Sequence, residues 1–212
     1  MGWTAKSSLA LWQRRAKFRK GRRDHWQRLL DHANQMVAKR RKQVAENAKD
    51  RPTVMYDSVT VSAIPKDAKA VAGYTAGRFL TFPTLEKLFP KARRLSIAVA
   101  SRFDAECLDV EPGDATPEVA AAWVRRQHAR GVKRPVIYCS VSSARDVLSK
   151  LAAGGIARSQ IRLWTAHFTF HPHRCGPECG FGFTGRADAT QWTDKALGRN
   201  LDESQVDPSF WD

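Results

Sequence analysis

Two carboxylate residues, Asp109 and Glu111, are separated by one residue at the end of an apolar run that begins at Ala105, directly before a Pro-Gly pair. Side chains alternate between the faces of a strand, so both carboxylates are predicted to point the same way. Repulsion between them raises one pKa relative to the other, leaving one group protonated and one ionised. Glycoside hydrolysis uses such a pair, whereas a strand end carrying two solvated acids is the simpler alternative.

A second set of reactive residue types lies in the segment 168–186. His171, His173, Cys175 and Cys179 have the residue types of a tetrahedral zinc site. A disulfide that joins the two cysteines and closes a small loop rich in Gly and Pro is preferred over zinc, and unpaired thiols are the third alternative. We therefore assign no metal, and the carboxylate chemistry needs no cofactor.

Short β-branched runs alternate with helical patterns after Pro52, which predicts a parallel α/β fold. The expected strands are 54–56, 70–74, 95–99, 105–110, 135–139, 161–166 and 188–192, and the expected helices are 117–129 and 143–152. The remaining two cysteines, Cys107 and Cys139, lie in two of these strands and are expected to be buried free thiols.

Polar residues follow several of these strands, at the edge where active sites gather in α/β barrels. They are Asp57, Tyr74, Asp109, Glu111, Tyr138 and Gln191. Because about 160 residues are few for a full eight-fold barrel, we expect a compact, incomplete or irregular (β/α) barrel over residues 53–212.

The chain has 212 residues and a net charge of +15, and residues 1–50 hold 14 Lys/Arg and 4 Asp/Glu, which is +10 of that total. We predict a basic helical arm over residues 1–52, with a helix from Asp24 to about Ala48 and Gly21 separating it from an earlier basic segment. Such an arm is typical of a protein that meets a polyanion: nucleic acid, anionic lipid or an acidic wall polymer. Nucleic acid is disfavoured, because no DNA- or RNA-binding motif accompanies the charge.

No run of residues is long and apolar enough to cross a bilayer. The first 20 residues lack an uninterrupted apolar core and a small-residue cleavage site, so we expect no secretory signal.

Six segments, in this order, resemble the strand motifs of glycoside hydrolase family 25, the phage and bacterial N-acetylmuramidase lysozymes, and of related glycoside-hydrolase-like domains. They are Tyr56-Asp57-Ser58, Leu108-Asp109-Val110-Glu111, Val136-Ile137-Tyr138-Cys139-Ser140, Leu163-Trp164-Thr165-Ala166-His167, Gln191-Trp192-Thr193 and Asn200-Leu201-Asp202. The resemblance runs from about Val54 to Phe210. The basic arm lies outside it, and the segment 168–186 is an insertion relative to the family pattern.

The resemblance implies four catalytic carboxylates. Glu111 matches the general acid, Asp109 the carboxylate beside it, and Asp57 the aspartate that ends the first strand. Asp202 matches the aspartate of the closing segment, with Asp194 as its rival. The predicted groove residues, whose rings or amides would contact sugars, are Tyr74, Tyr138, Trp164, Gln191 and Trp192, although core packing explains each of them equally well.

We therefore expect a peptidoglycan hydrolase that cleaves between N-acetylmuramic acid and N-acetylglucosamine. Its arm, residues 1–50, would contact an anionic wall polymer, a membrane surface or another virion component. The expected location is the host cytoplasm and then the cell wall after release, or the virion itself. The alternatives are an inactive relative that binds wall glycans and a virion structural protein with a polyanion-binding arm.

Overall fold

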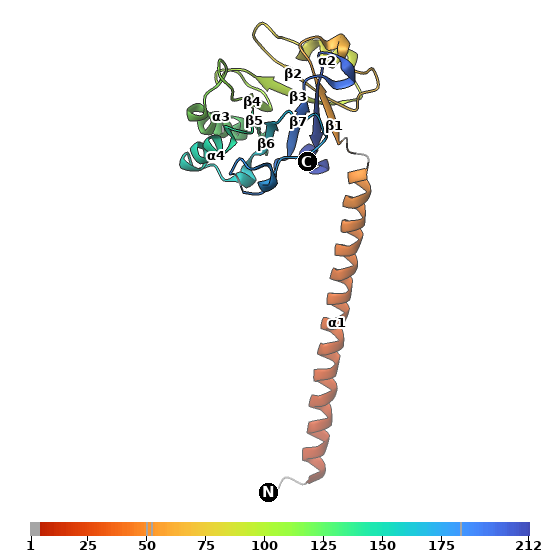
Figure 1. The fold of residues 1–212 in the computed structure, drawn as a ribbon. Helices are drawn as coiled ribbons and strands as arrows, with labels where there is room; N and C mark the ends of the chain where they lie inside the picture. The colour runs from red at the N-terminus through yellow and green to blue at the C-terminus, as the bar shows by residue number, and fades with distance from the viewer. Residues whose placement is uncertain (1–4, 50, 52, 183) are drawn as a thin grey trace. The chain divides into compact units, whose positions relative to one another are not determined.

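The computed structural model describes residues 5–49, 51, 53–182 and 184–212 (Figure 1). The chain divides between residues 50 and 51 into two compact units. The first contains a single long helix, and the second contains a β-barrel with its covering helices.

Helix α1 (Ala5–Lys49) is continuous over 45 residues (Figure 1). The predicted helix start at Asp24 and the break at Gly21 are therefore wrong, because both residues lie inside the helix. A single glycine costs a helix only about 1 kcal/mol relative to alanine, which neighbouring helix formers offset. Every described side chain of α1 is exposed, including those of Trp12, Phe18 and Trp26.

The second unit is a closed barrel in which each of eight strands pairs with the next and β8 pairs with β1. Strands β1 to β7 run parallel, whereas β8 is antiparallel to both of its neighbours. The strands are β1 (Val54–Asp57), β2 (Ala70–Tyr74), β3 (Arg93–Ala98), β4 (Cys107–Asp109), β5 (Val136–Ser140), β6 (Arg162–Ala166), β7 (Ala189–Thr193) and β8 (Asp202–Val206). The prediction of a compact, irregular α/β barrel with an N-terminal helix is confirmed, and the sheet itself is complete.

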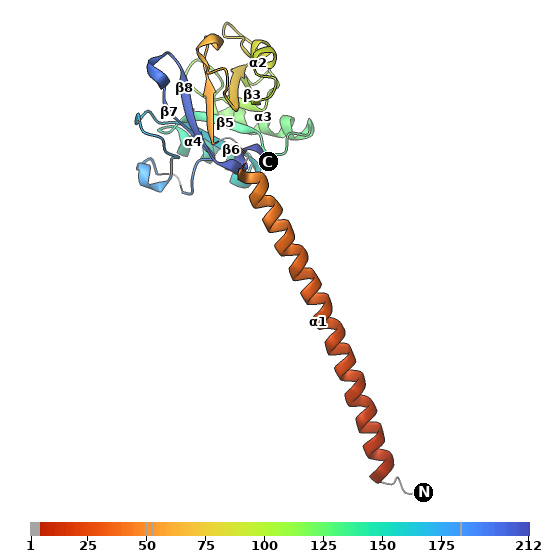
Figure 2. The ribbon, with the colours of Figure 1, turned by 90° about the vertical axis from the view of Figure 1, so that its right-hand side faces the viewer.

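Within residues 53–182 and 184–212, the α-helices are α2 (Phe82–Leu88), α3 (Pro117–Ala129) and α4 (Ala144–Ala153). Figure 2 shows strands β7 and β8 side by side. Their connection contains the 3-10 turn Ala196–Gly198 and no α-helix, which keeps it short. Helix α2 was not predicted. It packs against β2 so tightly that a Cβ atom on Gly73 would lie 2.4 Å from Leu85 Cδ1.

Three apolar clusters are found in the barrel unit: an interior core, a larger outer core, and a smaller outer cluster that includes Leu85 of α2 and Phe89. The interior core contains Met55, Ile97, Tyr138 and Trp164, which alternate along their strands with residues that face outward. The larger outer core packs α3 and α4 onto strands β4 to β6, and it includes Trp123. Cys107 and Cys139 are buried free thiols, as predicted. Among the described residues, no helix combines the length and apolarity that a membrane crossing requires.

Candidate active site

The carboxyl end of β1 faces the start of β8, because these two strands are antiparallel. Asp57 and Asp202 are directly opposite each other in that register. Burial, together with the charge of Asp202, raises the pKa of Asp57 well above its ordinary value. When ionised, Asp57 leaves its Oδ2 buried without a donor. When protonated, it donates a hydrogen bond to Asp202, which raises the pKa of Asp57 and acts on the pKa of Asp202 against the burial that raises it.

The second pair of acids lies where β4 ends in a tight turn. The backbone N–H of Asp114 donates to the carbonyl of Glu111 over 3.0 Å, closing a turn with Pro112 and Gly113 at its centre. Gly113 has a φ of +98°, which a type II turn requires at this position. The turn brings a third acid, Asp114, beside Asp109 and Glu111. The sequence analysis did not predict a role for Asp114.

The acids of this turn raise one another's pKa values. Burial, and then the charges of Glu111 and Asp114, raise the pKa of Asp109 to about 8. Burial and the charge of Asp114 also raise the pKa of Glu111. Oδ1 of Asp109 is buried without a hydrogen-bond donor among the described residues. A protonated carboxyl group at neutral pH is therefore built into this end of the barrel.

Tyrosine side chains join the two acid pairs into one site. Tyr138 lies close enough to Glu111, Asp57 and Asp109 for their charges to raise the pKa of its phenol further after burial. The pKa of Tyr74 is raised by burial and by the charges of Asp57, Asp109 and Asp202. The four predicted catalytic carboxylates thus converge on one place.

A hydrogen-bonded chain fixes the amide of Gln191. Its Oε1 accepts from the Tyr138 hydroxyl at 2.5 Å, so its NH2 group is the part that faces and lowers the pKa of Asp202. The rings of Tyr138 and Trp164 pack with centroids 4.5 Å apart. Trp164 is only 1% exposed, and its Nε1 donates to Ser204 Oγ at 3.0 Å. It is therefore a core residue, and the prediction that it stacks on sugar is wrong.

Open aromatic surface at this end of the barrel comes mainly from residues that the sequence analysis did not select. Phe79 follows β2 and is 38% exposed, and its ring lies 6.2 Å from that of Tyr74. Phe168 and Phe170 follow β6 and are 46% and 59% exposed. Trp192 is half-buried in β7, and its role remains a prediction. The usable signal was an aromatic residue within a few positions of a strand's carboxyl end.

Asp194, the rival of Asp202, lies beyond β7 and pairs with Lys195 at 3.6 Å. It stays near enough to raise the pKa of Asp202, but it does not face Asp57. The antiparallel register therefore selects Asp202.

The histidine and cysteine side chains of this segment form a compact cluster, in which His167 takes the place predicted for His171. The cluster contains His167, His173, Cys175 and Cys179. His171 contributes only its backbone carbonyl, which lies 3.0 Å from His173 Nδ1. Both cysteines are free thiols, so the preferred disulfide is not formed.

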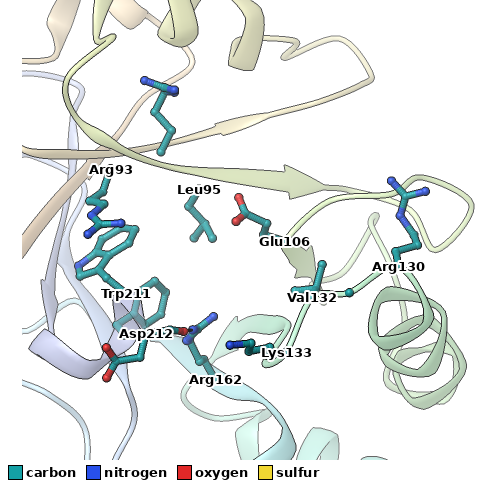
Figure 3. Close-up of a pocket in the computed structure, with 12 residues that line it drawn as sticks. Arg93, Leu95, Glu106, Arg130, Val132, Lys133, Arg162, Trp211 and Asp212 are labelled. Atoms are coloured by element: carbon teal, nitrogen blue, oxygen red, sulfur yellow. Dashed lines mark hydrogen bonds between the residues drawn. The ribbon is translucent and has the colours of Figure 1, made fainter.

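The opposite end of the barrel has a cavity of about 470 Å³ (Figure 3). Its walls come from the amino ends of strands, and basic side chains dominate them: Arg93, Arg94, Arg130, Lys133 and Arg162. Glu106 also lines it, with its Oε2 bound by the backbone N–H and hydroxyl of Ser96. No predicted catalytic residue lines this cavity, and the carboxyl end is where barrel enzymes place their chemistry.

No protein-family model matches the sequence, and no curated protein matches it. Among solved structures, the barrel is similar to a 1.07 Å crystal structure of an uncharacterized protein from B. stearothermophilus. The TM-score is 0.51 at 14% sequence identity, and the alignment covers 74% of this chain and 96% of the other. At this identity the likeness establishes a shared fold and nothing about activity.

Proposed function

We propose that this chain is a glycoside hydrolase of the N-acetylmuramidase type, acting on peptidoglycan. The observation that carries the proposal is the meeting of Asp57, Asp109, Glu111 and Asp202 at the carboxyl ends of the strands, where each has a raised pKa. Carboxyl groups with perturbed pKa values in one place are typical of acid/base sites. Hydrolysis of a glycosidic bond requires such a site, because the leaving oxygen must be protonated.

The proton donor must reach the substrate as well as hold a proton. Asp109 has the higher pKa, about 8, but is only 3% exposed. Glu111 is half-buried on the turn after β4, where a sugar can contact it. We therefore assign the general acid to Glu111. Protonated Asp109 then adds no negative charge beside it, and sugar that covers Glu111 raises its pKa further by removing water.

The second pair of acids lies at the same end of the barrel. With Asp57 protonated and donating to Asp202, the pair carries a single negative charge, on Asp202. That charge stabilises the positive charge that develops on the sugar ring in the transition state. Gln191 orients Asp202, and Tyr138 in turn orients Gln191.

The proposed substrate is a wall glycan. The exposed rings of Phe79, Phe168 and Phe170 follow strands β2 and β6, and aromatic faces of this kind stack on sugar rings. The basic helix α1 suits an anionic polymer that accompanies the glycan, such as an acidic wall polymer. A protein that works this way reaches the wall after release from the host cytoplasm or as part of a virion.

The test measures reducing sugar released from purified peptidoglycan, with mass spectrometry of the fragments. The intact protein is expected to leave muramic acid at the new reducing ends, and Glu111→Gln is expected to release sugar at least about 10²-fold more slowly. Release at the wild-type rate in Glu111→Gln would show that the acid is misassigned. If neither protein releases sugar from walls of several bacteria but both sediment with them, the chain binds glycans without cleaving them.

A further inference from the structure

Four potential metal ligands converge beside the outer face of strands β6 and β7. They are His167, directly after β6, and His173, Cys175 and Cys179, from the connection to β7 (residues 167–188). Their ligand atoms all lie within 4.8 Å of one another. His167 Nδ1 is 3.2 Å from Cys175 Sγ and 3.1 Å from His173 Nε2, and the latter is 3.5 Å from Cys175 Sγ.

We infer that these four residues bind a structural zinc ion. Zinc takes nitrogen at about 2.0–2.1 Å and thiolate sulfur at about 2.3 Å in a tetrahedron, which separates the ligand atoms by roughly 3.3–3.8 Å. The separations of 3.1–3.5 Å around His167, His173 and Cys175 are close to those edges. Two sulfurs and two imidazole nitrogens also form the ligand set that selects zinc among the common divalent ions.

The protonation state of His173 suits a metal ligand. Its Nδ1 lies 3.0 Å from the backbone carbonyl of His171 and 3.1 Å from the hydroxyl of Thr169, which donates its own proton to that carbonyl, so both neighbours accept from Nδ1. The proton of the neutral ring is therefore on Nδ1, and the lone pair of Nε2 points at the cluster. Bonds of this kind to the far nitrogen orient the histidine ligands of most zinc sites.

Hydrogen bonds to the barrel strands fix the positions of two of the ligands. The backbone N–H of Cys175 donates to Thr190 Oγ1 at 2.9 Å, and this hydroxyl is hydrogen-bonded in turn to Thr165. The backbone N–H of His167 donates to the carbonyl of Gln191 at 2.9 Å. Two strands of the barrel thus fix two ligands, and the phenyl ring of Phe181 packs edge-on against His167.

The ligand set is closed, because four protein side chains complete a tetrahedron and leave no position for water. Such a site is structural and not catalytic. Zinc bound there ties the β6–β7 connection to the barrel wall next to Gln191. The inference does not depend on the proposed hydrolase activity.

The first experiment measures zinc per chain by mass spectrometry of the full-length protein, purified without chelators. The wild-type protein is expected to hold about one zinc ion. His173→Ala and Cys179→Ser are expected to lose at least about nine-tenths of it, since each removes a ligand. His171→Ala is the matched control in the same segment. It keeps the backbone carbonyl that orients His173, and so it is expected to retain the metal.

A second measurement keeps the inference testable if a variant fails to fold. Wild-type protein stripped of metal is titrated with Co²⁺, and a tetrahedral thiolate site gives visible d–d absorption that zinc then abolishes. Chelation is also expected to lower the melting temperature of the wild-type and His171→Ala proteins. The inference is overturned if the wild-type protein holds no zinc and shows no cobalt spectrum, or if His173→Ala retains full zinc.

Discussion

At the amino ends of the barrel strands, the carboxylate of Asp188 accepts hydrogen bonds from Arg134 Nη2 at 3.0 Å, Arg158 Nη2 at 2.5 Å and the backbone N–H of Leu163 at 2.8 Å. At the carboxyl ends, Asp109 is surrounded by other acids, and one of its oxygens has no donor among the described residues. The same barrel therefore supplies hydrogen-bond donors to both carboxylate oxygens of Asp188 but leaves one oxygen of Asp109 without a donor among the described residues.

This difference separates a structural role from a functional one. An acid with two arginine partners is positioned for stability. Buried acids that lie mainly beside other acids cost stability, and proteins keep such arrangements where chemistry needs a raised pKa. Two arginines of the basic cavity also have structural partners: Arg94 donates to the carbonyls of Phe89 and Pro90, and Arg162 donates to that of Arg134. Charge alone does not make that cavity a site.

The largest expected effect distinguishes Glu111 at the carboxyl end from Glu106 at the amino end. Glu111→Gln removes the proton donor and is expected to slow sugar release by about 10²–10⁴-fold. Glu106→Gln, which keeps an oxygen able to accept from Ser96, is expected to leave the rate unchanged. Rates of reducing-sugar release at a fixed enzyme concentration measure both. Equal losses in the two variants would remove the distinction between the ends.

The pH dependence of stability follows from Asp109. Its pKa is about 8 in the folded protein and near its ordinary 3.8 when unfolded. The folded state therefore binds the proton more tightly, so this group's contribution is fully present below pH about 4 and is lost as the pH rises to about 8. The loss is at most about 1.4 kcal/mol per pH unit, or about 4 kcal/mol between pH 5 and pH 8.

Urea denaturation at several pH values tests this expectation. Asp109→Asn cannot ionise, so its unfolding free energy is expected to fall less steeply with pH than that of the wild-type protein, and the variant is expected to be the more stable of the two at pH 8. Parallel curves for the two proteins would show that Asp109 has an ordinary pKa.

Removing the acid at the amino end, Asp188, is expected to lower stability, in contrast to the gain expected for Asp109→Asn. Asp188→Asn leaves Arg134 and Arg158 without their shared carboxylate and is expected to lower the unfolding free energy by about 3 kcal/mol. Urea denaturation at about pH 9, above the pKa of about 8 of Asp109, compares this loss with Asp109→Asn, which removes a carboxylate charge only in that range. If both variants shift the unfolding free energy in the same direction, the presence or absence of hydrogen-bond donors does not separate a structural acid from a functional one.

The smallest effect concerns the hydrogen-bonded chain at the carboxyl end. Tyr138→Phe removes the donor to Gln191 Oε1 and leaves a buried acceptor unpaired. The expected cost is about 1–2 kcal/mol of stability, measured by thermal or urea denaturation. Because Gln191 orients Asp202, the rate of sugar release is also expected to fall. A variant with normal stability and normal activity would show that the hydrogen bond from Tyr138 does not orient the site.

Much of the barrel could be predicted from local patterns. The parallel strands from β1 to β7 were recognisable because buried strands read as short apolar runs between turn residues. The Asp109 and Glu111 pair was recognisable as an Asp-x-Glu motif at the end of an apolar run, but the prediction that both lie in the strand is wrong, because β4 ends at Asp109 and Glu111 lies on the following turn. Helix α2 was missed, since seven residues carry too little periodicity, and the continuity of α1 through Gly21 was missed because a glycine was weighted as a break.

The sequence predicted which residue types form the candidate site more reliably than which individual residues contact one another there. The sequence analysis selected Trp164 for its type, but the structure buries it inside the barrel. It selected His171, yet the chain path brings His167 to the cluster instead. Asp114 and Phe79 were missed because neither belongs to a motif.

By itself, the sequence determined the order and type of most barrel strands, the charge difference between helix and barrel, and the acid pair after β4. These follow from interactions between residues close together in the chain. Only the tertiary structure decided that Asp57 faces Asp202, because that contact exists only when antiparallel β8 closes the sheet against β1. The raised pKa values have the same origin, since burial and the approach of other acids are properties of the folded barrel.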